Sequence, residues 1–140
     1  MAETKSMSII LHSNDLDKAM AAFILAAGAA AKGMNVTMFF TFWGLFTVKK
    51  GGADKSKLSK MNMGGLGTKM MKGVMKKNNV APITELMSDC KDLGVRFVAC
   101  EMTMELMNVP KEMLISEVTE VGGVGTYLDA ASEGNVNLFI

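Results

Sequence analysis

The sequence lacks an apolar stretch that is long enough to cross a membrane. The stretch 19–31 is apolar but spans only thirteen residues, and 33–48 contains Asn35, Gly44 and three threonines. A helix that spans a bilayer needs about 20 predominantly apolar residues. We therefore do not expect membrane association.

Cysteine is scarce, with only Cys90 and Cys100 in 140 residues. Their spacing matches neither a C-x-x-C redox motif nor a metal-binding pattern. The first seven residues, MAETKSM, do not show the basic and then apolar pattern of a signal peptide. We therefore expect a cytoplasmic protein in a reducing setting, where a structural disulfide is not expected.

Acidic residues are almost absent from one part of the chain. Between Lys49 and Lys77 there are nine lysines but a single acid, Asp54. Because the whole chain has a net charge of +1, the remainder carries about seven net negative charges. The segment 49–77 is thus positively charged, whereas the rest of the chain is negatively charged.

This basic segment also lacks aromatic residues, since Phe, Tyr and Trp are all absent from 49–77. Single-stranded nucleic acids are commonly bound by basic grooves with interleaved aromatic side chains, so we expect no nucleic-acid partner. The glycine-, lysine- and methionine-rich excursion at about 49–79 is either a solvated surface segment or a lid or docking surface. Within it, residues 68–77 are expected to form an amphipathic helix.

The rest of the chain alternates short apolar runs with segments of helical periodicity. Ser13 or Asn14 is expected to cap the first helix, Gly33 to end it, and Pro82 to occupy the first position of a later one. Expected strands are 6–12, 35–40, 95–99, 117–121 and 135–140. Expected helices also include 102–107, 111–116 and 122–132.

Strands that alternate with helices predict an α/β fold with a parallel sheet covered on both faces. With 140 residues, the chain is long enough for one domain, 1–140. In such folds, sites lie beyond the carboxyl ends of the strands. Three stretches meet that condition: 12–14, 41–44 and 100–104.

Cys100 is the strongest candidate for chemistry. A cysteine between a strand and a helix can place its sulfur near free backbone N–H groups, which stabilise a thiolate or the outer sulfur of a persulfide. The neighbouring Glu101 opposes this, because a carboxylate raises the pKa of a nearby thiol. The alternative is a small buried hydrophobe at a strand end. Cys90, on the apolar side of its helix, is expected to be a core residue.

Other residues near the three strand ends are candidate binding residues. His12, the only histidine, is a candidate acid, base or anion donor. A structural role for it is the alternative. The remaining candidates are Ser13, Asn14, Trp43, Gly44, Met102 and Thr103.

No cofactor or metal is expected. The glycines at 122, 123 and 125 lack the third glycine of a dinucleotide fingerprint, and those at 64, 65 and 67 do not complete a phosphate loop. Met102 and Met104 could offer soft ligands to Cu(I), but alternate residues of a helix do not share a face. Core packing explains the fifteen methionines better.

Three stretches of the sequence resemble the DsrE/DsrF-like superfamily, in its subgroup labelled predicted peroxiredoxins. They are 16–45, 99–109 and 120–140, and KMNMGGLGTKMMK in the basic segment fits as well. The most specific part is the Cys-x-Met-x-Met-x-x-Met pattern that begins at Cys100 and ends at Met107.

The resemblance implies a single-domain three-layer sandwich with a mainly parallel sheet of about five strands. It also implies a homo-oligomer, a trimer or hexamer, with possible partners in a sulfur relay. Cys100 would hold sulfane sulfur as a persulfide. The peroxiredoxin label is weaker, because Phe97, Val98 and Ala99 leave no Thr-x-x-Cys loop.

Three functional hypotheses follow. The first is a sulfur carrier or sulfurtransferase with a reactive, exposed Cys100. The second is a non-catalytic oligomeric binding or assembly module with an inert Cys100. The third is a membrane-associated redox accessory that uses the lysines and the aromatic run 39–46. The same aromatic side chains could instead line a pocket above Cys100 or a subunit seam.

Overall fold

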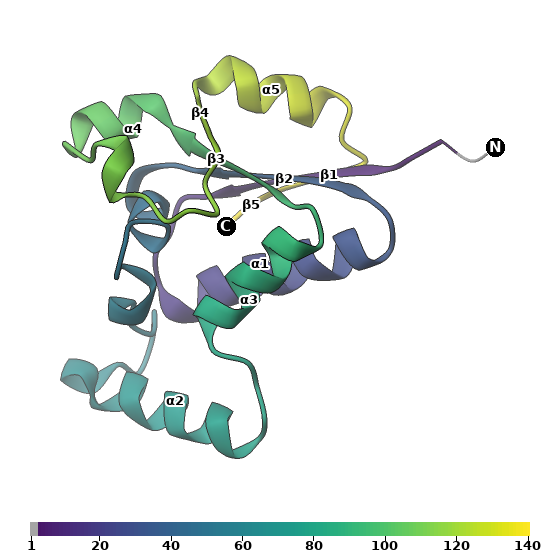
Figure 1. The fold of residues 1–140 in the computed structure, drawn as a ribbon. Helices are drawn as coiled ribbons and strands as arrows, with labels where there is room; N and C mark the ends of the chain where they lie inside the picture. The colour runs from purple at the N-terminus through teal and green to yellow at the C-terminus, as the bar shows by residue number, and fades with distance from the viewer. Residues whose placement is uncertain (1–2) are drawn as a thin grey trace.

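The computed structural model describes residues 3–140 and contains a five-stranded sheet between two layers of helices (Figure 1). The strands are β1 (Ser6–Leu11), β2 (Asn35–Phe40), β3 (Arg96–Cys100), β4 (Glu120–Gly122) and β5 (Val136–Phe139). The helices are α1 (Leu16–Ala31), α2 (Leu66–Lys77), α3 (Ile83–Asp92), α4 (Glu101–Leu106) and α5 (Val124–Ser132). Short 3-10 turns are η1 (Phe42–Thr47), η2 (Ala53–Lys55), η3 (Met63–Gly65) and η4 (Lys111–Met113). The expected single-domain α/β sandwich is confirmed.

The sheet has the strand order β4-β3-β2-β1-β5, and every neighbouring pair is parallel. It is therefore wholly parallel rather than mainly parallel. All five strands end at the same edge, because parallel strands share one direction. This edge carries the residues that follow Leu11, Phe40, Cys100 and Gly122.

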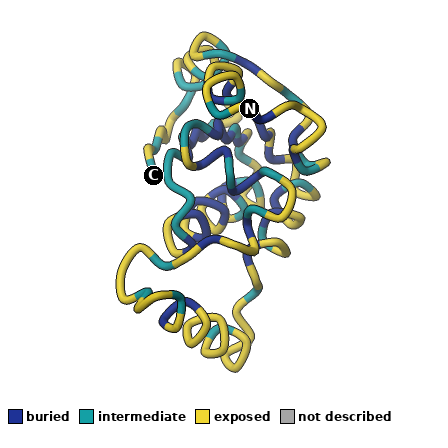
Figure 2. Tube along the Cα trace, turned by 90° about the vertical axis from the view of Figure 1, so that its left-hand side faces the viewer, coloured by how far each residue is buried: buried dark blue, intermediate teal, exposed yellow. Residues whose placement is uncertain are grey.

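The main core lies between the sheet and the layer formed by α1 and α3 (Figures 1 and 2). The rings of Phe23, Phe40 and Phe97 form its centre, with centroids 5.3–6.0 Å apart. The buried alanines of α1 let that helix approach the sheet closely, as expected from the alanine-rich sequence. They are Ala19, Ala22, Ala26 and Ala29.

The opposite face of the sheet has a smaller cluster, formed by Phe39, Val98 and Cys100 and covered by Ile10 and Tyr127. Tyr127 belongs to α5, none of whose residues is fully buried. Strand alternation separates the two faces, since Phe40 and Phe97 point to the main core while Phe39 and Val98 point to α5.

Several predicted boundaries were wrong. Asp15 is the N-cap residue of α1, because the backbone N–H of Ser13 still bonds to the carbonyl of Ile140 beyond β5. Pro82 is the N-cap of α3 and not its first residue. β3 begins at Arg96 and includes Cys100. The predicted strand 117–121 and helix 122–132 begin later, because the pairing of Cys100 with Gly122 sets the register.

The basic segment folds as η2, η3 and α2 on the far side of α1 and α3 (Figure 1). One tether to the body is Asp17, whose carboxylate accepts hydrogen bonds from the backbone N–H and the hydroxyl of Ser59, at 2.7 and 2.6 Å. The backbone N–H of Leu16 donates another hydrogen bond, of 2.8 Å, to the carbonyl of Lys57. Because α2 lies away from the α5 face, it is not a lid over Cys100 in this structure.

Candidate functional site

His12, Thr41 and Cys100 form a row across the carboxyl edge of the sheet. The register pairs Leu11 with Phe40, and Phe40 with Ala99, so the next residue of each strand continues the row. Strand alternation turns all three side chains toward the α5 face. His12 and Cys100 are separated by β2, which puts their backbones roughly 10 Å apart.

Cys100 is the last residue of β3 and the N-cap residue of α4. Its side chain is buried, with only 4% of the residue exposed, among Phe39, Val98 and Tyr127. The expectation of an exposed Cys100 was therefore wrong for this structure. Cys100 shares this cluster with Phe39 and Val98, and Tyr127 packs against the cluster with its ring centroid 5.6 Å from that of Phe39.

Thr103 joins α4 to the turn after β2. Its buried hydroxyl accepts a hydrogen bond from the backbone N–H of Phe42 and lies 3.0 Å from the hydroxyl of Thr41. Phe42 has a left-handed backbone, with φ of 47°, which is uncommon for a bulky residue. Thr103 thus stabilises this turn beside Cys100 and has its own hydrogen bonds within the protein.

The methionines of the Cys-x-Met-x-Met-x-x-Met pattern do not converge. Met102 is 56% exposed, whereas Met104 and Met107 pack against the main core. This separation is what helical spacing requires. Within residues 3–140, no group of three or more His, Cys, Asp and Glu residues is arranged to hold a metal ion.

His12 lies between two aromatic rings, with centroids 5.3 Å from Phe42 and 5.4 Å from Phe139. Its backbone carbonyl accepts a hydrogen bond of 2.8 Å from the N–H of Gly44. A Cβ atom at Gly44 would lie 1.9 Å from the carbonyl oxygen of Leu11, so only glycine allows this close approach.

The remaining predicted residues lie near His12. Ser13 and Asn14 are half-buried in the connection from β1 to α1. Trp43 is 51% exposed, and its ring stacks on Phe46 with centroids 6.4 Å apart. The structure thus groups these residues with His12 in one loop region and joins Thr103 to Thr41, while Met102 stays at the surface.

Cys90 is a buried core residue, as expected. Its thiol donates a hydrogen bond of 3.2 Å to the carbonyl of Phe23. Burial, with a smaller contribution from Asp89, raises the pKa of Cys90 to about 12. Because the thiolate is the nucleophile, Cys90 is unreactive near neutral pH.

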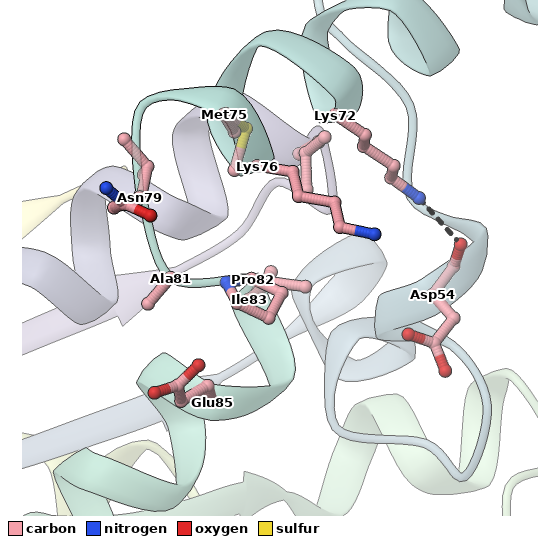
Figure 3. A pocket seen from close by; sticks show the side chains of 11 residues that line it. Asp54, Lys72, Met75, Lys76, Asn79, Ala81, Pro82, Ile83 and Glu85 are labelled. Atoms are coloured by element: carbon pink, nitrogen blue, oxygen red, sulfur yellow. Dashed lines mark hydrogen bonds between the residues drawn. The ribbon is translucent and has the colours of Figure 1, made fainter.

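A mainly apolar cavity lies away from Cys100, between α2 and the beginning of α3 (Figure 3). Its volume is about 540 Å³. Met75, Pro82 and Ile83 line it, together with Lys72, which donates a hydrogen bond to the carbonyl oxygen of Asp54. None of the predicted site residues lines this cavity.

The sequence placed Thr41 in the strand-end stretch 41–44 without making it a candidate binding residue, and it gave no role to Tyr127. Thr41 directly follows a predicted strand, so its position was available from the sequence. Tyr127 lies within a predicted helix, and nothing in the local pattern shows that this helix packs over Cys100. That contact depends on the order of the strands in the sheet.

The chain matches the model of the DsrE/DsrF/DrsH-like family over residues 3–58 and 49–139. The chain belongs to this family. It is 46% identical to the uncharacterised protein YrkE of Bacillus subtilis, over 99% of this chain and 98% of that protein. It is 36% identical to the sulfur carrier protein DsrE2 of Allochromatium vinosum, over 99% of both chains.

Solved structures of this family's fold resemble the chain as well. MTH1491 of Methanobacterium thermoautotrophicum superposes with a TM-score of 0.65 and 15% identity, over 97% of this chain and 99% of that one. YchN of E. coli gives a TM-score of 0.64 and 10% identity, over 98% and 100%. No helix within residues 3–140 has the length and apolar character of a membrane span.

Proposed function

We propose that this member of the DsrE/DsrF/DrsH-like family is a sulfur carrier that holds sulfane sulfur as a persulfide on Cys100. The observation that carries the proposal is the position of Cys100 at the carboxyl end of β3 and the N-cap of α4. Backbone N–H groups at the start of a helix can donate hydrogen bonds to a bound anion, such as the outer sulfur of a persulfide. The relative DsrE2, named as a sulfur carrier, supports the same function.

The proposed step needs no external oxidant. The Cys100 thiol first releases its proton to water, and the thiolate attacks the sulfane sulfur of a donor such as thiosulfate. A new sulfur–sulfur bond forms on Cys100, while the donor's own sulfur–sulfur bond breaks and sulfite leaves with the electron pair. An acceptor thiolate then attacks the outer sulfur and regenerates the Cys100 thiolate. The acceptor would belong to a partner protein of a sulfur relay.

The burial of Cys100 has a consequence for this step, because a donor must reach the sulfur. Tyr127 of α5 packs against the cluster that contains Cys100, and α5 contributes no fully buried residue to the protein. Movement of α5 is therefore the shortest route to an accessible Cys100. When α5 is closed, the same cover would protect a persulfide from solvent thiols.

A second candidate is a binding or assembly module in which Cys100 is inert. The observation that favours it is the burial of Cys100 in an apolar cluster, which is where an unreactive cysteine is usually found. β2 also lies between the strands that carry His12 and Cys100. His12 is therefore not next to Cys100, as a base that activates the thiol would be.

The deciding experiment is intact mass measurement after incubation with thiosulfate or polysulfide, with and without reductant. The variants are Cys100→Ala and Cys90→Ala. The carrier function predicts a reducible gain of one sulfur atom that Cys100→Ala abolishes and Cys90→Ala retains. If the wild type gains no sulfur and Cys100 resists alkylation in the folded protein, the binding module is the better explanation.

A further inference from the structure

The cavity between α2 and the beginning of α3 has an aliphatic floor. Leu16 and Ile83 belong to its lining and are only 1% and 4% exposed, and the half-buried Met75 contributes from α2. The connection between the two helices supplies Val80, Ala81 and Pro82. The volume of about 540 Å³ falls within the range of roughly 300–1,000 Å³ that is usual for small-molecule sites. The cavity is therefore large enough for a small ligand with an apolar body.

The cavity exists because α2 does not pack closely on the helices beside it. α2 packs mainly against η3, the turn that precedes it, and the hydrogen bond from Lys72 to the carbonyl of Asp54 holds it at one edge. Figure 3 shows Lys76 on the α2 side of the cavity and Ile83 on the α3 side. A ligand bound between them would contact both parts of the protein.

Lys76 supplies a positive charge to this cavity. Figure 3 shows its ammonium nitrogen in the space between α2 and the beginning of α3. Within residues 3–140, no ion pair or hydrogen bond occupies the ammonium group of Lys76. The ammonium group of Lys72, one turn earlier on the same helix, is already bonded to the carbonyl of Asp54. One cation is thus available to a ligand in the cavity.

Two exposed carboxylates also belong to the lining, but they lie at its edges. Figure 3 shows the carboxylate of Asp54 turned away from Lys72. It also shows the carboxylate of Glu85 on the side of Ala81 and away from Lys76. These two acids would repel a ligand with several negative charges, whereas a single negative charge can pair with Lys76. The charges of the lining therefore favour a monoanion.

We propose that this cavity binds an aliphatic monocarboxylate of medium chain length. Its chain would lie against Leu16, Met75 and Ile83, which removes apolar surface from water. Its carboxylate would accept a charge-assisted hydrogen bond from Lys76. Among residues 3–140, no aromatic side chain lines the cavity, so no ring is present on which a planar ligand would stack. This inference goes beyond the proposed sulfur-carrier function and does not depend on it.

Binding would also attach α2 more firmly to α1 and α3, because the ligand contacts residues of all three helices. A ligand that binds only the folded protein stabilises it by mass action. We therefore expect the backbone amide hydrogens of α2 to exchange more slowly with solvent when decanoate is bound.

An NMR titration of the methyl-labelled full chain with decanoate tests the proposal. The methyl signals of Leu16 and Ile83 should shift and saturate with one dissociation constant. Lys76→Gln removes the positive charge and should raise that constant about ten-fold. Decanol has the same chain without the negative charge, and it should bind about ten-fold more weakly than decanoate. Met75→Gln should also weaken binding, because a polar amide then replaces part of the apolar lining.

The matched controls are Lys77→Gln and Met70→Gln. Both side chains are exposed on α2 and neither lines the cavity, so these variants should bind decanoate like the wild type. If Lys77→Gln weakens binding as much as Lys76→Gln, the general positive charge of the segment holds decanoate and the proposal is wrong.

Two further results would overturn the proposal. The first is that decanoate does not shift the methyl signals of Leu16 and Ile83. The second is that decanol binds as tightly as decanoate. Circular dichroism verifies that each variant is folded, and Lys76→Gln changes only an exposed side chain, so it keeps the test valid if Met75→Gln does not fold. Sulfur uptake by Cys100 is measured separately, and its failure leaves this test intact.

Discussion

The hydroxyl of Tyr127 lies 3.0 Å from that of Ser8, and this contact fixes α5 over the side of the sheet on which Cys100 is buried. Ser8 is fully buried and donates its own hydrogen to the side-chain oxygen of Asn137, at 2.7 Å. The Ser8 oxygen is therefore free to accept from Tyr127. One hydrogen bond thus links the cover of Cys100 to the centre of the sheet.

Tyr127→Phe should make Cys100 more reactive. The substitution keeps the ring against Phe39 but removes the hydrogen bond to Ser8, at a cost of about 1 kcal/mol in stability. Because α5 would then open more often, we expect faster reaction of Cys100 with a thiol reagent in the folded protein. The measurement is the rate of native-state alkylation, resolved by site with peptide mass spectrometry.

Cys90 provides an internal reference for that experiment, since it lies in the other core. Its alkylation should stay slow in both proteins. An equal increase at Cys90 and Cys100 would indicate general destabilisation instead of local opening. An unchanged rate at Cys100 would mean that α5 does not control access.

Gly44→Ala should destabilise the protein strongly. A Cβ atom there would lie 1.9 Å from the carbonyl oxygen of Leu11, so the backbone at the end of β1 must move. We expect a loss of about 3 kcal/mol in the free energy of unfolding, measured by urea denaturation. Gly28→Ala is the matched control, because it is exposed in α1 with no atom within 4 Å of the new Cβ. It should gain roughly 0.5–1 kcal/mol.

Cys90 should make the protein less stable at alkaline pH. Its pKa rises from 9.0 to about 12 on folding, so the unfolded chain releases a proton that the folded chain retains. The stability contribution is complete below pH 9 and is lost as the pH rises toward 12. The stability of the wild type relative to Cys90→Ala should therefore decrease across this range in urea titrations. A constant difference between the two proteins would contradict the burial of this thiol.

Asp17 should contribute to the attachment of the basic segment at Ser59. Burial raises the pKa of Asp17, but the hydrogen bonds from Ser59 outweigh it and hold the pKa below 3.8. The tether is therefore intact above pH 3.8 and is lost as the pH falls through the lower, folded value. In Asp17→Asn the NMR shift of the Ser59 amide should already be displaced at neutral pH. Asp15→Asn is the control, because its contact with Lys18 is exposed and contributes little.

Most of the fold followed from local patterns. The run NVTMFF is β2 with the expected bounds, and Gly33 ends the first helix with φ of 86°, a value that favours glycine. These features depend on neighbouring residues alone, so periodicity and turn chemistry are sufficient. The strand predicted at 117–121 is observed at Glu120–Gly122 as β4. Its position depends on pairing with β3, which local sequence patterns do not reveal.

Only part of the candidate site could be predicted from the sequence. The sequence indicated that Cys100 and His12 lie at strand ends, and the parallel sheet puts them on one edge. It did not indicate that β2 separates them, since strand order is not a local property. Thr41 and Thr103 meet across sixty-two positions of sequence, a contact that no spacing rule predicts.

By itself the sequence determined the α/β class, the helix and strand periodicities, the separation of positive and negative charge, and the core position of Cys90. Each of these depends on residue type and short-range order. Only the tertiary structure decided that Cys100 is buried, because its cluster with Phe39 and Val98 is completed by Tyr127 from a helix that precedes the last strand. It also decided that α2 stands apart with an unpaired apolar and basic surface, since burial depends on what the folded chain places nearby.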